Sequence, residues 1–505
     1  ILSCGILVLT VNSAPFKNNK FQAENDLSGL WLSETNNQLW SINKGQVEYF
    51  EVTKGSEETG SVGTCLKLFG NDVVEKENFK SHADLSLFNK ITSKELHRTS
   101  SGSLAPIALN KIIKLPTSCS NPYLIPKQYI HQPEVDFTIF WNSFNELYTS
   151  LKLRGITQEK WNKLYLSYFD RAKSTTNAQE LFNIFDEIMQ LSFSEKTVEG
   201  KKVKADVHVE LFSPTLDKEI LLYTKFEHDR GKAAMTNPLK THLFNYIDTT
   251  VFSPLVVKGS VYGVYSMFAK IKGSNTGLLV LNSMFDFSLR KLDLDSATGF
   301  NEELTAVDEL LNQTLELAEK HKLTKIVVDV RNNIGGYDAI ALKIAGYFAS
   351  KQTKALRKSK RVGGTIDQMM MAPSKSFTVK PVAKPFSGEV VLLTSRYTVS
   401  AGEIFAMAMK MLPNVTVVGE NTNGALSDVL EMHTTNGWKI SLSNELYSYA
   451  SSTNVSTKLT LEGSGVKPDH IIEYKSQKED SQALFNDDAL EYSVKLLLND
   501  KKSRN

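Results

Sequence analysis

The stretch GEVVLLTSRYTVSAGEIFAMAMKMLPNVTVVGENTNG, residues 388–424, decides the fold. Its start, residues 390–394, is a short apolar run rich in β-branched side chains, which predicts a buried strand. After residue 400, apolar side chains recur at helical spacing, at Ile404, Phe405, Ala408, Met411 and Leu412. A buried strand therefore runs directly into a helix, and this unit is the building block of α/β domains.

The turn between the strand and the helix places Ser400 at the mouth of the helix. There, free backbone amides and the positive end of the helix dipole favour a nascent anion. The position suits a nucleophile, and the Ala401 amide suits one half of an oxyanion hole. The alternative is a helix cap, because Ser400 followed by Glu403 matches the capping box. On this stretch alone a helix cap is the commoner arrangement. The rest of the chain must decide whether Ser400 is a cap or a nucleophile.

The composition is that of an ordinary globular protein. The chain has 505 residues, 41% of them hydrophobic and 23% charged, which is enough apolar material for two or three cores. A net charge of +2 does not indicate the strongly basic surface that nucleic-acid-binding proteins have. Apart from the start of the chain, no stretch approaches the roughly 18 continuous apolar residues of a membrane span. We expect no nucleic-acid partner and no membrane span.

The first residues, ILSCGILVLTVNSAPF, predict a truncated secretory signal over residues 1–13, cleaved before Ala14. The mature chain is then expected to be secreted or to lie in the lumen of the secretory or endolysosomal pathway. Cys65 and Cys119 would remain, either as one disulfide, which we favour, or as two buried thiols. Three N-glycosylation acceptors follow from the sequence: Asn312, Asn414 and Asn454.

The chain divides into five parts by pattern. After the signal, residues 14–128 form a β-rich module and linker, in which the turn signals at 36–37 and 44–45 predict a small antiparallel sheet. Residues 129–200 have a period of 3.6 and predict a helical domain. Residues 201–475 form an α/β core, and residues 476–505 form a last helix and tail. No chemistry is apparent in the β-rich module, so we expect the active site where the helical layer meets the core.

Residues 205–211, ADVHVEL, alternate as a strand does and put Asp206, His208 and Glu210 on one polar face. Three interpretations remain open for His208: a solvated face, a metal ligand or a catalytic base. A metal site is the weakest, because the nine histidines show no cluster with ligand spacing. No metal and no other cofactor is implied.

A second strand–turn–helix unit lies upstream of the first. Residues 325–330 predict a buried strand, Gly335 and Gly336 a tight turn, and Ile340, Ile344 and Phe348 a helix. Two such units joined by a crossover predict a parallel or mixed sheet with helices on its faces. The glycine pair lets the backbone turn its amides outward, whereas a plain strand-to-helix turn is the alternative. No phosphate-loop pattern is present there.

Four separated motifs resemble one family in combination. They are Asp206-Val-His208, the segment DVRNNIGG at 329–336, TVSAGE at 398–403 with GENTNG at 419–424, and EGSGVKPD at 462–469. Together they resemble the tail-specific (carboxy-terminal processing) protease family, over roughly residues 130–475. The resemblance implies a crotonase/ClpP-like core with a mixed sheet and helices, serine-peptidase activity, and a peptide or protein substrate.

The resemblance also implies the site residues. The processing-protease branch has a Ser-Lys dyad, but Ala425 stands at the lysine position, and no PDZ-like insertion is apparent. The sequence is closer to the tricorn-like and retinoid-binding-protein-like branch, which implies Ser400 as nucleophile, His208 as base and Glu462 as the carboxylate. That pattern has a serine before its histidine, whereas this chain has Val207. The implied oxyanion hole combines the Ala401 amide with that of Gly336 or Gly335.

Two other functions stay open. The first is an α/β-hydrolase-type esterase, because residues 398–402 read as a nucleophile elbow with its first glycine replaced, and Ser400, Asp428 and His470 then follow in chain order. The second is a catalytically silent member of the family that binds a hydrophobic ligand or a protein partner.

Overall fold

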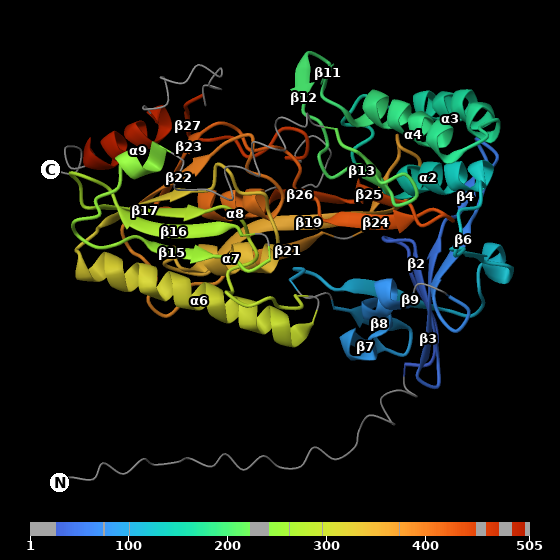
Figure 1. Cartoon of the computed structure of the whole chain (residues 1–505), viewed down its shortest axis with the longest axis horizontal. Helices are drawn as coiled ribbons and strands as arrows, with labels where there is room; N and C mark the ends of the chain where they lie inside the picture. Colours follow the sequence, from blue (N-terminus) through green and yellow to red (C-terminus); the bar gives the residue numbers. More distant parts are fainter. Residues whose placement is uncertain are drawn as a thin grey trace, which may run out of the picture.

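The computed structural model describes residues 27–73, 76–99, 102–222, 242–261, 263–294, 296–372, 374–450, 461–473 and 487–499. The predicted signal at 1–13 and the acceptor Asn454 lie outside these residues. Figure 1 shows three layered parts: an N-terminal sheet, a helical layer over a small sheet, and a larger sheet covered by helices. None of the described helices is long and apolar enough to cross a membrane.

The N-terminal sheet has eight strands in the order β10-β6-β3-β2-β1-β9-β8-β7. Their bounds are β1 Gly29–Ser33, β2 Gln38–Asn43, β3 Gln46–Val52, β6 Cys65–Phe69, β7 Phe88–Thr92, β8 Glu95–Arg98, β9 Ile107–Ile112 and β10 Tyr123–Leu124, with a small hairpin of β4 Gly55–Ser56 and β5 Ser61–Val62. The predicted antiparallel sheet is confirmed, although β10 pairs with β6 in parallel.

A tight hairpin and a disulfide are two features of this sheet that the sequence indicated. Lys44 and Gly45 both have positive φ (48° and 81°), as the two-residue hairpin between β2 and β3 requires. The disulfide between Cys65 in β6 and Cys119 in the 3-10 turn Thr117–Ser120 confirms the predicted pairing. Two further 3-10 turns, Lys76–Ala83 and Leu85–Leu87, precede β7.

The helical layer consists of α2 Pro133–Leu147, α3 Gln158–Lys173 and α4 Ala178–Phe193. It packs on a four-stranded sheet made of β13 Glu210–Ser213, β14 Lys218–Ile220, β24 Val429–His433 and β25 Lys439–Ser443, in the order β14-β13-β25-β24. Trp141 and Trp161 stack at 4.0 Å between α2 and α3. One hydrophobic core therefore joins residues from both halves of the chain.

The strand predicted over residues 205–211 begins only at Glu210. Asp206 is fully buried, and its Oδ1 accepts a hydrogen bond from the His208 amide at 3.1 Å. This local side-chain bond competes with the strand conformation. His208 therefore lies in a turn, and the alternation predicted for Asp206, His208 and Glu210 is wrong.

The larger sheet has the order β15-β16-β17-β18-β22-β23-β27, in which β17 to β27 run parallel and β15 and β16 are antiparallel. The bounds are β15 Leu255–Lys258, β16 Tyr265–Lys270, β17 Thr276–Leu281, β18 Lys325–Asp329, β22 Glu389–Thr394, β23 Val415–Gly419 and β27 His470–Ile471. The predicted mixed α/β architecture is confirmed.

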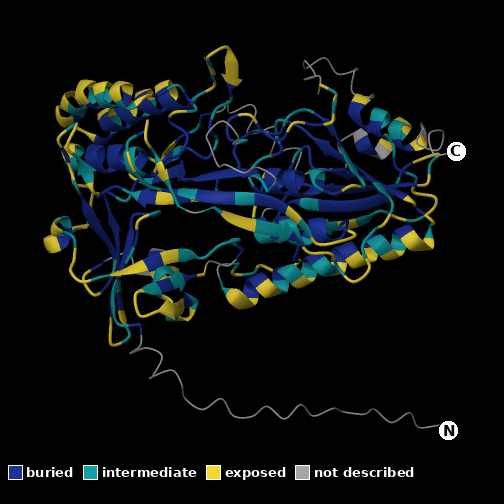
Figure 2. Cartoon of the chain, turned by 180° about the vertical axis from the view of Figure 1, so that it is seen from behind, coloured by how far each residue is buried: buried dark blue, intermediate teal, exposed yellow. Residues whose placement is uncertain are grey.

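Helices cover both faces of this sheet, and its central strands β17 and β18 are therefore buried along their whole length (Figure 2). One face packs α6 Ala297–Lys320, α7 Asp338–Gly346 and α8 Ala401–Lys410, and the other packs α9 Asp488–Asn499. A long strand, β19 Thr353–Gly363, pairs with β20 Met370–Met371, β21 Lys375–Val379 and β26 Glu445–Tyr449 beside α7 and α8. The turn before α8 carries Ser400.

Candidate active site

Ser400 has an unusual backbone. Its φ of 54° and ψ of −126° place a non-glycine residue in a conformation that costs on the order of 1–3 kcal/mol. Its amide donates to the Ala425 carbonyl at 2.9 Å, which holds the turn in place. The Ser400 side chain makes no capping hydrogen bond to α8. The capping-box alternative is therefore not what the structure shows, and the hydroxyl group is left for chemistry.

Glu403, in the first turn of α8, has a different role from the one its spacing suggested. It is fully buried, and one carboxylate oxygen accepts from the Thr422 hydroxyl (2.5 Å) and the Gly424 amide (2.7 Å), while the other accepts from the Ala425 amide (2.8 Å). Burial raises the pKa of Glu403 to about 7. Glu403 thus fixes the loop whose Ala425 carbonyl holds Ser400.

The glycine turn lies directly against Ser400. A Cβ atom at Gly335 would stand 2.6 Å from the Ser400 Cβ, and Gly335 has a φ of 93°, so no larger residue fits. The Gly335 amide donates to Asn333 Oδ1 at 2.9 Å, and the Gly335 carbonyl accepts from the Met284 amide at 2.6 Å.

The geometry favours Gly336 over Gly335 as an oxyanion donor. Within the described parts of the chain, the Gly336 amide has no acceptor, and in a trans peptide it points opposite to the Gly335 carbonyl. The Ala401 amide is the first of α8, one of the amides that a helix leaves without an intrahelical partner.

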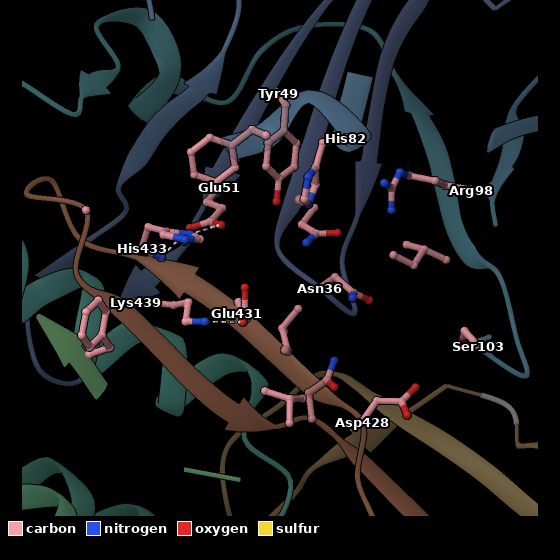
Figure 3. A pocket seen from close by; sticks show the side chains of 18 of the residues that line it. Asn36, Tyr49, Glu51, His82, Arg98, Ser103, Asp428, Glu431, His433 and Lys439 are labelled. Atoms are coloured by element: carbon pink, nitrogen blue, oxygen red, sulfur yellow. Dashed lines mark hydrogen bonds and ion pairs between the residues drawn. The ribbon is translucent and has the colours of Figure 1, made fainter. Parts of the chain in front are cut away.

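Ser400 and Gly336 face a cavity of about 1120 Å³. Its opposite wall comes from the N-terminal sheet and its turns, including Tyr49, His82 and Arg98 (Figure 3). Glu51 in β3 connects this wall to β24. Its carboxylate is hydrogen-bonded to the His433 ring at 2.9 Å and accepts a hydrogen bond from the His433 amide at 2.7 Å. The N-terminal module, in which no chemistry was apparent from the sequence, therefore lines the cavity that Ser400 faces.

His208 lies in the turn before β13 and is 8% exposed. Burial lowers its pKa below the ordinary value, and Asp206 and Asp428 oppose this effect. Its Nδ1 is buried without a hydrogen-bond partner among the described residues. No hydrogen bond joins His208 to Ser400 or to Glu462 within the same residues. Among the described residues, the His208 imidazole thus makes no hydrogen bond to either of the other two predicted site residues.

Glu462 lies in the turn that follows residue 461, and one of its oxygens accepts from the Leu426 amide at 3.1 Å. Burial, with the nearby Asp206 and Glu403, raises the pKa of Glu462. Because Ala425 holds Ser400 and the next residue holds Glu462, the two predicted site residues are connected through one short loop. Glu462 lines a second cavity, which lies beside the helical layer.

The Asp206 carboxylate interacts electrostatically with both His208 and Glu462. It accepts from the Tyr148 hydroxyl at 2.7 Å and from the Ser443 hydroxyl at 3.1 Å, and its charge affects the pKa of both His208 and Glu462. The D-x-H spacing was the available signal for Asp206, but it indicated an exposed face. The folded turn instead buries this carboxylate.

The residues of the alternative esterase triad have other partners. Asp428 accepts from Lys358 Nζ at 2.5 Å, within a buried charge cluster that includes Glu445 at 2.8 Å from the same ammonium. His470 lies in β27, and its ring nitrogen is 3.1 Å from the Tyr492 hydroxyl of α9. In the described chain, no group of three or more His, Cys, Asp or Glu side chains is arranged to hold a metal ion.

Comparison with known proteins supplies independent information. Residues 276–472 match the model of peptidase family S41. The fold is shared with a candidate peptidase from Parabacteroides merdae, with a TM-score of 0.55 and 19% identity over 74% of this chain and 99% of that one. Mature CPAF complexed with lactacystin gives a TM-score of 0.45 at 10% identity, over 73% and 99% of the two chains. A photosystem II C-terminal processing protease gives 0.37 at 12% identity, over 68% and 94%.

Proposed function

We propose that this chain is a serine-type peptidase related to peptidase family S41, whose model matches residues 276–472, and that it hydrolyses peptide bonds through an acyl-enzyme at Ser400. The observation that carries the proposal is the Ser400 turn. A strained backbone presents an uncapped hydroxyl to a large cavity, beside the unengaged amide of Gly336 and the first amide of α8. Such strain persists where the surrounding structure holds it for function.

In the proposed reaction, Ser400 Oγ attacks the carbonyl carbon of the substrate while its proton passes to His208 Nε2. The oxyanion that forms accepts hydrogen bonds from the Gly336 and Ala401 amides, each typically worth about 2.7–4 kcal/mol of transition-state stabilisation. The tetrahedral intermediate then expels the amine, which takes the proton from His208. Water hydrolyses the acyl-enzyme by the same steps and regenerates Ser400.

The proposal assigns Glu462 to orient His208 and to stabilise the imidazolium that forms. It requires the His208 ring to move until Nε2 reaches Ser400 Oγ, because the two are not hydrogen-bonded in this structure. Catalytic hydrogen bonds are often long without substrate and tighten in the complex. The buried Asp206 beside both residues supports this assignment, since its negative charge favours a protonated imidazole during turnover.

A fluorophosphonate probe tests the proposal directly. We expect the probe to modify Ser400, located by mass spectrometry of the digested protein, and we expect the labelling to disappear in His208→Ala. His470→Ala is the matched control and should label like the unsubstituted protein. Labelling that depends on His470 instead would support the esterase, and a folded protein that is not labelled at all would support the silent binding protein. The unengaged His208 is the observation that keeps this last function open.

The lowered pKa of His208 predicts how the activity depends on pH. Only the neutral imidazole accepts the serine proton, so activity is lost as the pH falls through the pKa of His208. Burial lowers that pKa, and the acid limb of kcat/KM should therefore have its midpoint below the ordinary value of about 6.5. The initial rate of fluorophosphonate labelling, measured from about pH 4 to about pH 8, checks this. A midpoint above the ordinary histidine value would contradict the assignment of His208 as base.

We also propose that the protein is secreted or resides in a lumen of the secretory or endolysosomal pathway. The disulfide between Cys65 and Cys119 supports an oxidising compartment. Among the predicted glycosylation acceptors, Asn312 is exposed on α6, whereas the Asn414 side chain is partly buried and donates to the Gly388 carbonyl at 3.1 Å. Occupancy at Asn312 is therefore the more compatible with the fold.

A further inference from the structure

The second cavity, of about 1320 Å³, has a strongly basic wall. It lies between α3 and the hairpin of β11 Lys196–Val198 and β12 Lys201–Val203, which projects beside α3 and α4 in Figure 1. Arg154 and six lysines line it: Lys152, Lys160, Lys163, Lys196, Lys201 and Lys202. The acidic side chains in the wall are Glu199, Asp367 and Glu462. Positive charge is therefore in excess.

Several of these charges are not compensated within the protein. Lys160 Nζ donates to the Gly155 carbonyl and Lys196 Nζ to the Leu191 carbonyl, each at 3.1 Å. In the described chain, neither ammonium has a carboxylate within ion-pair distance, in contrast to Lys163 and Lys202. Burial together with Arg154 and Lys160 lowers the pKa of Lys196 to about 8. Burial is the larger cause, and the neighbouring cations Arg154 and Lys160 add to it.

Two buried donors in the wall also lack a hydrogen-bond acceptor. The Ser192 hydroxyl and Arg154 Nη2 are buried, both residues are 1% exposed, and neither atom has a hydrogen-bond partner among the described residues. Arg154 Nη2 forms an ion pair with Asp206 Oδ2 at 3.7 Å. Arg154 Nη2 is compensated by the Asp206 charge, and the Ser192 hydroxyl is thus the buried donor in this wall that has no partner among the described residues.

We propose that this cavity binds a ligand that carries several phosphate or sulfate groups. Oxyanions accept hydrogen bonds from ammonium, guanidinium and hydroxyl donors, and charge assistance makes these bonds about twice as strong as neutral ones. The lysines are spread over α3, the hairpin and the preceding loop, so one small anion reaches only part of the set. The first turn of α3, which contains Lys160, adds the positive end of a helix dipole. The cavity shares Glu462 with the proposed catalytic residues, but its lysines do not line the Ser400 cavity, and binding of the anion does not require hydrolysis.

Isothermal titration calorimetry of the full chain with inorganic tripolyphosphate tests the proposal, and sucrose octasulfate distinguishes a sulfated from a phosphorylated source. We expect binding at about 50 mM salt that weakens as salt rises, and a loss of at least about tenfold in affinity in Lys160→Gln/Lys196→Gln. The matched control is Lys173→Gln/Lys218→Gln, which removes two exposed lysines outside the cavity wall and should bind as before.

Binding of either probe with this selective loss supports the site, and the better probe indicates the source. Equal weakening in both double variants would show attraction to bulk charge only, and would overturn the proposal. Absence of binding by both probes would overturn it as well. All four lysines are exposed or half-buried, so circular dichroism is expected to show that the variants fold.

Discussion

Ser400→Ala is expected to lower kcat/KM for a peptide substrate by about 10⁵- to 10⁶-fold, as loss of the nucleophile does in other serine peptidases. The remaining rate comes from the oxyanion donors and substrate binding, which the variant keeps. The free energy of unfolding should change little, because the Ser400 side chain makes no hydrogen bond to the helix that it precedes. Hydrolysis of a fluorogenic peptide and denaturant unfolding measure the two quantities.

Ser103→Ala is the matched control for this prediction. Ser103 lines the same cavity, and its hydroxyl donates to the Ala105 carbonyl rather than to any predicted catalytic group. We expect its kcat/KM to stay within about threefold of the unsubstituted protein. If Ser400→Ala lost stability as much as activity, Ser400 would be a structural residue and the nucleophile would have to be found elsewhere.

Glu403→Ala is expected to reduce both stability and activity. The substitution leaves the Thr422 hydroxyl and the amides of Gly424 and Ala425 without their acceptor, and each buried unsatisfied donor costs about 1–3 kcal/mol. Relief of the buried carboxylate offsets part of this, so we expect a loss of about 2–5 kcal/mol in the free energy of unfolding. Because the loop holds the Ser400 amide, kcat should fall as well, with KM less affected.

Glu316→Ala provides the comparison, since Glu316 is an exposed helical glutamate on α6. Its stability should stay within about 0.5 kcal/mol of the unsubstituted protein. Glu403→Gln keeps one acceptor oxygen and should restore part of both the stability and kcat. A Glu403→Ala variant that unfolds like Glu316→Ala would show that the 422–425 loop does not depend on this carboxylate.

Local pattern predicted much of the fold. The strand at 390–394 and the helix after Ser400 were visible because apolar residues recur at periods that only one kind of element satisfies. The turn at 44–45 was visible because its backbone needs positive φ. The paired cysteines followed from their number and the predicted compartment. For the strand, the helix and the turn, the information lies within a few neighbouring residues.

The site was only partly predictable, because its geometry depends on contacts between distant segments. The motif at 398–403 indicated Ser400, but the capping spacing of Glu403 concealed its bonds to residues 422–425. Alternation around His208 indicated a strand, whereas the Asp206 carboxylate stabilises a turn. Nothing local to Tyr49 or Arg98 shows that they line the Ser400 cavity, since two separate sheets have to meet before it exists.

The pairing of β13 with β25 has a consequence for excision experiments. The family match starts at residue 276 and ends at 472, yet it includes β24, β25 and the turn between them. Their apolar side chains Leu430, Met432, Trp438, Ile440 and Leu442 are buried in one core with helices that precede residue 200. A fragment cut at the limits of the match would expose that whole surface to water. We therefore expect the segment that the family model matches not to fold by itself, because the first half of the chain completes this core.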